Sequence, residues 1–457
     1  MPQSLARLTA PMMLGVSSSI LVQMIEIGFI GQLGTDYIAA ITFTFPLVMV
    51  LSSISLGISI GTSSVIARQV GLDRNSSAAD AISPEVKSLG THSLVLVTSA
   101  MAVLVFICWL SIDPLFLRLG ADPALLPKIN GYLSIYLPGS ILFTTAMICG
   151  SIMRANGSAS IPGMIMTLGS AINLLLDPFL IFGWWGLPRL ELEGAAWAMT
   201  ASRMITLVIT FGYLYRSEMI NSLLRLSGFW HSTRRILHVG LPAIATNLIG
   251  PITMGIITRL LAAHGETAVA GFGVASRIEA VAVMLLFALS GSIGPFVGQN
   301  LGAGEIDRVK QGVRVSHIFS MSWGGCVALL LLGFGAHIVL LVDDNVSVMK
   351  TALLYLSIVP WSYGCWGMLM MASASFNAIG KPLPSTIMSF TRMLVLYVPL
   401  ASLLNDLYGV SGIFTATAIS NTLFGIVGLV WFRAHLRSQR DRPLAAQPRA
   451  LTKGSST

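Results

Sequence analysis

Apolar and polar positions alternate along this chain in long blocks. Apolar runs of about 20 residues recur from near the first residue to the neighbourhood of residue 433, and short polar or Gly/Pro-containing segments separate them. A helix of that length crosses the hydrocarbon core of a bilayer. The pattern predicts twelve membrane-spanning helices, at residues 8–30, 40–67, 90–111, 130–153, 160–184, 194–215, 236–262, 268–298, 315–342, 350–374, 384–404 and 411–433.

The composition of the chain agrees with a membrane location and excludes most soluble proteins. Apolar residues make up 54% of the 457 positions, charged residues make up only 10%, and the mean hydropathy is +0.79. Soluble globular proteins carry about 25% charged residues, so this chain could not cover a water-facing surface. We therefore expect an all-α membrane protein within a lipid bilayer. We expect no nucleic-acid partner, because no aromatic-plus-basic motif accompanies the net charge of +8.

Basic residues indicate how the predicted helices are oriented. Twelve spans place both termini on one side, and that side carries 19 Lys and Arg residues against 4 on the other. Lys and Arg accumulate in cytoplasmic loops, so both termini are expected in the cytoplasm. The basic residues of the opposite side are Arg118, Lys128, Arg189 and Lys350.

The two halves of the chain resemble copies of one unit. The offset of 231 residues that aligns Pro11 with Pro242 also aligns Gly71 with a second glycine. Each copy contains six spans, so the copies share one orientation and form two pseudo-symmetric six-helix bundles, an arrangement found in transporters that alternate access. The expected division is an N-lobe at 1–216, a cytoplasmic linker at 217–235, a C-lobe at 236–435 and a basic, disordered tail at 436–457.

Glu26 in the first span is the main candidate for function, because a charge at mid-bilayer costs about 2.5–3.5 kcal/mol. Gln23 lies three residues earlier, on the same helix face. Pro11 lacks an amide proton and can bend this helix, which makes it a candidate hinge. The structural alternative is a carboxylate that a buried arginine holds permanently.

A second polar pair lies in the fifth span. Asn173 and Asp177 are four residues apart, so both side chains point to one helix face. Pro178 has no N–H, and the carbonyl of Leu174 beside this pair therefore loses its helical partner. The amide, the carboxylate and the freed carbonyl could bind a proton or a small cation. The alternative is a polar cluster that caps a kink.

The sequence leaves the other intramembrane charges open. Glu279 lies near the start of its span, where snorkelling towards the interface is the simpler interpretation. Four arginines are either partners of the acids or interfacial anchors, and they are Arg203, Arg259, Arg277 and Arg392. A carboxylate in a low-dielectric medium is disfavoured in its charged form, so it holds a proton or a cationic substrate but hardly both. Mutual exclusion of this kind couples proton entry to cation exit.

The sequence lacks the motifs of metalloproteases and of ATP-driven pumps. The seven histidines form no H-E-x-x-H pattern, and no G-x-x-x-x-G-K-[ST] loop occurs. The four cysteines have no metal-ligand spacing. We expect a transporter without cofactors and without enzymatic activity.

Several motifs resemble the multidrug and toxic compound extrusion (MATE) family. The resemblance covers approximately residues 5–435. The motifs are Gln23-Met-Ile-Glu26 followed by Gly31-Gln-Leu-Gly34, Arg68-Gln-Val-Gly71, Arg154-Ala-Asn-Gly157, Asn173-Leu-Leu-Leu-Asp177-Pro178, Gly194-Ala-Ala-Trp-Ala198 and Gly298-Gln-Asn-Leu-Gly-Ala303.

The resemblance implies a MATE/MOP-type fold of two six-helix bundles around a central cavity. It also implies export of cationic amphipathic compounds, such as drugs or dyes, against entering H⁺ or Na⁺. The coupling-ion site maps onto Glu26, Asn173 and Asp177, which could also hold Na⁺, and the N-lobe substrate cavity onto Gln23, Tyr132 and Thr200. We expect a monomer that spans the bacterial inner membrane many times.

This sequence departs from the family pattern in two places. The acid of the first helix is usually Asp, whereas here it is Glu26, which is one methylene longer. The seventh span, from Leu241 to Leu261, contains no acid, which favours the DinF-like branch and H⁺ over Na⁺ as the coupling ion. The alternatives are a lipid-linked precursor flippase of the same superfamily and an intramembrane enzyme. Such flippases often need more helices and a basic cavity.

Overall fold

The computed structural model describes residues 2–74, 82–118, 122–186, 188–221, 226–342 and 345–440. Every regular element in these ranges is a helix, and 12 helical stretches are long and apolar enough to cross a membrane. The predicted all-α fold with twelve spans is therefore confirmed.

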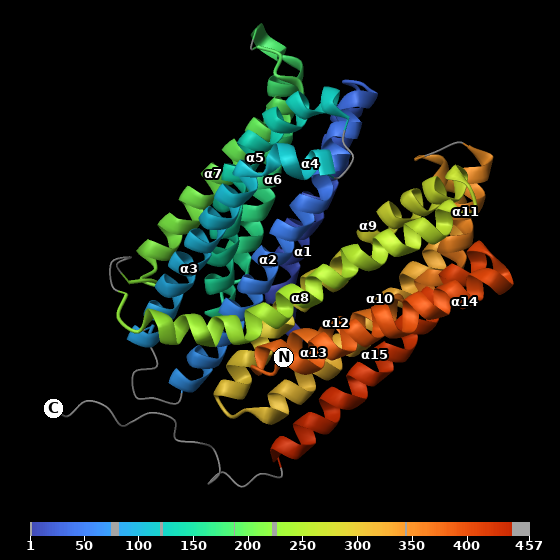
Figure 1. Ribbon diagram of the computed structural model, residues 1–457. Helices are drawn as coiled ribbons and strands as arrows, with labels where there is room; N and C mark the ends of the chain where they lie inside the picture. The colour runs from blue at the N-terminus through green and yellow to red at the C-terminus, as the bar shows by residue number, and fades with distance from the viewer. Residues whose placement is uncertain are drawn as a thin grey trace.

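The first half of the chain forms seven α-helices and two short 3₁₀ turns. They are α1 (Pro2–Gly31), α2 (Thr35–Asp73), α3 (Pro84–Leu110), α4 (Ile112–Arg118), η1 (Pro123–Leu125), α5 (Leu126–Ala155), α6 (Ser160–Phe182), η2 (Trp184–Gly186) and α7 (Glu191–Arg216). We call α1–α7 the N-lobe. Figure 1 shows these helices, coloured blue to green, as one group.

The second half forms the other group of helices in Figure 1. They are α8 (Phe229–Ala262), α9 (Glu266–Gly302), α10 (Ile306–Leu340), α11 (Val346–Ile358), η3 (Val359–Ser362), α12 (Tyr363–Ala378), α13 (Pro382–Phe390), η4 (Thr391–Tyr397), α14 (Val398–Tyr408) and α15 (Val410–Arg440). We call α8–α15 the C-lobe. Its segment η4 is a π-helix, a local widening of the helix that joins α13 to α14.

Two of the domain boundaries expected from the sequence differ in the structure. The linker expected at 217–235 is shorter, because α8 begins at Phe229, directly after Gly228 at φ 77°. Five polar or basic residues, His231 to Arg235, lie in the first turns of α8, so hydropathy missed a helix that extends beyond its apolar span. At the other end, α15 continues to Arg440, and the rest of the expected tail at 441–457 lies outside the described residues.

Large apolar side chains cover the outward faces of many helices. Phe106, Leu110 and Phe334 are 58%, 63% and 63% exposed, respectively. Exposed apolar surface on this scale is unfavourable in water. The twelve apolar spans and these outward faces together fit a multi-pass membrane protein.

The two lobes meet where α2 packs against α8 and α9. Gly71 and Gly302, the pair aligned by the internal repeat, lie against each other. A Cβ on Gly71 would lie 2.1 Å from the carbonyl oxygen of Gln299 and 2.9 Å from the Cα of Gly302. Gln299 accepts a hydrogen bond from Arg74 at 2.8 Å and donates one to the carbonyl of Ala155 at 2.7 Å. The repeat glycines thus allow backbone contact between the lobes, on the side where Arg74 lies.

Candidate functional site

Helices α1 and α6 bring together the three residues of the predicted coupling site. Glu26, Asn173 and Asp177 are 5%, 6% and 0% exposed. The two helices approach closely because both present glycines, and a Cβ on Gly15 would lie 2.9 Å from the carbonyl oxygen of Gly163. Asn173 donates a hydrogen bond from Nδ2 to Oδ2 of Asp177 at 3.0 Å. The four-residue spacing therefore produces the shared face that the sequence predicts.

Each of the two carboxylates has an oxygen without a partner. Among the described residues, neither Oε1 of Glu26 nor Oδ1 of Asp177 receives a hydrogen bond, and both atoms are buried. The two groups are close enough for their charges to interact. Burial of two unpaired negative charges side by side is strongly unfavourable. The arrangement therefore favours a proton or another cation at this site.

The positive charge of Arg203 on α7 acts on Glu26. Its guanidinium carbon lies 4.8 Å from the ring centroid of Tyr136 and 5.1 Å from that of Phe143, as expected for cation–π contacts. Its Nη1 atom is buried and has no hydrogen-bond partner among the described residues. Arg203 thus stacks on aromatic rings, and no described hydrogen bond joins it to the carboxylate of Glu26.

The three residues predicted for the N-lobe cavity lie in different surroundings. Tyr132 is 3% exposed and stacks on Tyr136 with ring centroids 5.5 Å apart. Thr200 donates to the carbonyl of Ile135 at 3.4 Å, so its hydroxyl is directed at α5. Gln23 lies on the exposed side of α1, whereas Glu26 is buried. The substrate-cavity role of these three residues stays a prediction.

Pro11 lies inside α1, and the helix continues through it without interruption. Gly163 of α6 packs against it, since a Cβ on that glycine would lie 2.3 Å from the carbonyl oxygen of Pro11. A helix with one hydrogen bond missing is easier to bend at that point. The hinge role of Pro11 remains a prediction.

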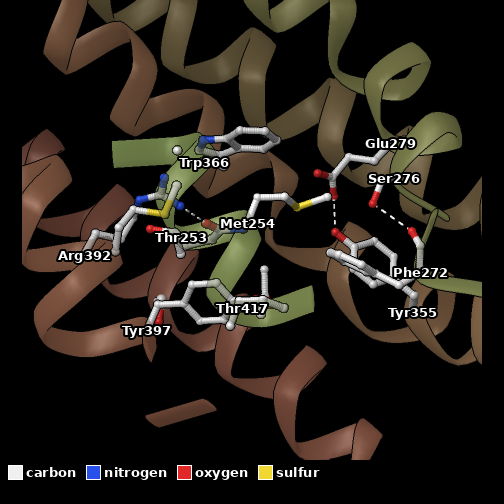
Figure 2. Close-up of a pocket in the computed structure, with 15 residues that line it drawn as sticks. Thr253, Met254, Phe272, Ser276, Glu279, Tyr355, Trp366, Arg392, Tyr397 and Thr417 are labelled. Atoms are coloured by element: carbon white, nitrogen blue, oxygen red, sulfur yellow. Dashed lines mark hydrogen bonds between the residues drawn. The ribbon is translucent and has the colours of Figure 1, made fainter. Parts of the chain in front are cut away.

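A second polar cluster lies in the C-lobe, around a pocket of about 300 Å³ (Figure 2). Glu279 on α9 accepts hydrogen bonds from the hydroxyls of Tyr355 and Tyr363, the latter at 3.0 Å. The snorkelling interpretation of Glu279 was therefore wrong, because two tyrosines from α11 and α12 hold the carboxylate inside the lobe. The sequence carried a signal for this cluster, since an offset of 223 residues aligns Tyr355-Leu-Ser-Ile with Tyr132-Leu-Ser-Ile of the N-lobe.

The four intramembrane arginines also separate by position. Arg392 is 9% exposed and donates a hydrogen bond from Nη1 to Oδ1 of Asn421 at 2.5 Å. Its Nε is buried and has no partner among the described residues. Arg259 and Arg277 are exposed, as interfacial anchors would be. Of these four arginines, Arg203 and Arg392 lie inside the lobes.

The comparison with known families decides the identity of the fold. A family model described as MatE matches residues 11–179 and 242–403. The chain belongs to the MATE family. The two matched segments begin 231 residues apart, which is the offset of the internal repeat. Proteins of this family are transporters, so the resemblance seen in the motifs and the expectation of a transporter rather than an enzyme are both confirmed.

Relatives of this MATE protein match it over nearly its whole length. It is 33% identical over 428 residues to a FAD transporter of Shewanella oneidensis, and the alignment covers 92% of each chain. It is 26% identical to the probable multidrug resistance protein YoeA of Bacillus subtilis, with 94% of each chain covered. It is 30% identical to the Vibrio cholerae MATE transporter VcmN, crystallised in the bent form, with a TM-score of 0.87 over 96% of this chain and 97% of that chain.

Proposed function

We propose that this MATE transporter is a secondary active exporter that moves organic compounds outward against entering protons. The observation that carries the proposal is the pair of buried carboxylates, Glu26 and Asp177, each with an oxygen that has no partner in the described part of the chain. Such acids in hydrocarbon are most stable when a proton or a cation neutralises them. Cationic amphipathic drugs or dyes are the substrates that this acidic lobe suits best, as in a multidrug exporter that confers drug resistance.

The coupling mechanism uses competition for the two acids. A proton that enters from outside neutralises the site and weakens its hold on a cationic substrate, which leaves outward. The protonated transporter then turns inward, loses its proton to the cytoplasm and binds the next substrate molecule. We infer that the lobe contacts at Gly71 and Gly302 close the cytoplasmic side, so this structure corresponds to an outward-facing state.

Protons are preferred to Na⁺ because α8 offers no acid between Leu241 and Leu261, which is typical of the DinF-like branch. The excess of Lys and Arg on one side supports an inner-membrane location with both termini in the cytoplasm. We propose a monomer as the functional unit.

Proteoliposomes loaded with a fluorescent cation provide the test of ion coupling. We expect an imposed proton gradient to accelerate efflux and an imposed Na⁺ gradient alone to have no effect, with protein-free liposomes as the control. Efflux driven by Na⁺ alone would overturn the choice of proton. Efflux that ignores both gradients would overturn the antiport proposal itself.

Flavin adenine dinucleotide is a second candidate substrate, because a relative with 33% identity over 92% of each chain is a FAD transporter. The diphosphate of this compound is anionic, so it cannot compete with a proton for a carboxylate. An anionic substrate requires a cationic side chain in the region that binds it. The C-lobe offers such a side chain in Arg392.

A further inference from the structure

We propose that the C-lobe pocket binds the anionic group of an organic substrate, such as the diphosphate of a flavin dinucleotide, through the guanidinium of Arg392. The inference rests on the second candidate substrate and does not depend on proton coupling in the N-lobe. It makes Arg392 a substrate-binding residue, in a lobe that lacks the acid pair of α1 and α6.

The position of Arg392 indicates a role beyond packing. It belongs to the π-helical segment η4, which also contributes Met393 and Tyr397 to the pocket wall. π-Bulges inside α-helices are frequent at functional sites. A guanidinium presents its N–H groups in a planar fork that matches phosphate and carboxylate. One of these groups is directed at Asn421, whereas Nε has no partner among the described residues.

No carboxylate of the described residues forms an ion pair with Arg392, and the charge of Glu279 acts on it only from across the pocket. Figure 2 shows Arg392 and Glu279 on opposite sides of the pocket, with Met254 between them. The tyrosines on the far side already donate to Glu279. An anion beside Arg392 would supply the missing partner, because a buried charge without one is costly. The hydroxyl of Ser420, which lines the pocket and is also buried without a described partner, could donate to the same anion.

The rest of the wall suits a planar ring attached to the anion. Trp366, Tyr397 and Phe272 line the pocket together with methionines. Aromatic side chains pack against flat rings in offset or edge-on geometry, and methionine adapts to irregular shapes. A volume of about 300 Å³ lies at the lower end for small-molecule sites. The pocket would therefore hold only part of a dinucleotide.

The structural alternative is that Glu279 permanently balances Arg392 across the pocket, with no role in substrate binding. In that case, removal of the guanidinium would weaken the binding of every ligand equally or destabilise the protein. If the pocket binds an anion, removal of the guanidinium weakens only the binding of ligands with an anionic group. Ligands that share one ring and differ in charge separate the two cases.

The test is equilibrium binding to the purified full-length transporter in detergent, without ion gradients. The probes are FAD, riboflavin, which has the same ring without phosphate, inorganic pyrophosphate and ethidium, an organic cation. Arg392→Gln should weaken FAD binding by ~10-fold or more, the size expected for loss of a charge-assisted hydrogen-bonded contact. Riboflavin and ethidium binding should change little. Arg392→Lys should retain part of the FAD affinity, since it keeps the charge but loses the planar fork.

Arg259→Gln is the matched control, because it removes an exposed C-lobe arginine outside the pocket. Pyrophosphate that competes with FAD in the wild type but not in Arg392→Gln would support the diphosphate as the recognised group. FAD affinity that is equal in the wild type and Arg392→Gln would overturn the proposal. So would equal losses for FAD and riboflavin, or no binding of FAD to the wild type. None of these results would bear on proton coupling, which the efflux assay tests separately.

Discussion

Glu26→Gln is expected to reduce proton-driven efflux of an organic cation to the level of protein-free liposomes. Glutamine has nearly the shape of glutamate, so it fills the same buried position on α1. It carries no charge and exchanges no proton, so a proton and a cation no longer compete at this position. The measurement is efflux of a fluorescent cation under an imposed proton gradient, with insertion checked by protein recovery in the liposomes.

Two further variants make this result specific. Glu266→Gln removes an exposed acid at the start of α9 and should leave efflux unchanged. Glu26→Asp keeps the carboxylate one methylene shorter, as in the usual MATE pattern, and should preserve measurable efflux. Full efflux by Glu26→Gln would remove this residue from the mechanism.

Asp177→Asn is expected to abolish proton-driven efflux as well, without loss of thermal stability. The Asn side chain still offers an oxygen to Nδ2 of Asn173, so the local hydrogen bond can persist. Substitution of a buried, incompletely partnered carboxylate by a neutral amide removes a desolvation cost. We therefore expect an unfolding temperature in detergent that is equal to or higher than that of the wild type.

Asn173→Ala provides the comparison for the Asp177 variant. It removes the hydrogen-bond donor but keeps both carboxylates, so it should lower efflux less than Asp177→Asn does. A marked drop in unfolding temperature for Asp177→Asn would contradict the account, because it would mean that Asp177 has a structural role in capping the Pro178 segment.

The spans and the N-lobe acid pair could be predicted because their signals are local. Hydropathy over a membrane length reports a span directly, and the spacing of Asn173 and Asp177 alone places both on one face of α6. The start of α8 could not be predicted in this way. Residues His231 to Arg235 are helical but polar, and hydropathy detects only the part of a helix that lies in lipid.

The C-lobe cluster could not be predicted from local pattern, because its contacts join distant segments. Glu279 looked like an interfacial charge until the structure brought Tyr355 and Tyr363 to it from other helices. Arg392 looked like either an anchor or a partner of an acid, and its burial depends on the packing of α15 through Asn421. In the N-lobe, Arg203 is placed by aromatic rings of α5, which no spacing within α7 reveals.

The central claim is that a proton and a cationic substrate exclude each other at the acids of the N-lobe. The most direct measurement is the proton release that accompanies binding of a cationic substrate to the purified protein in weakly buffered detergent solution. We predict that the wild type releases protons as it binds substrate and that the double variant Glu26→Gln/Asp177→Asn releases none. Substrate binding to the wild type with no release of protons, at pH values where the site is protonated, would contradict the account.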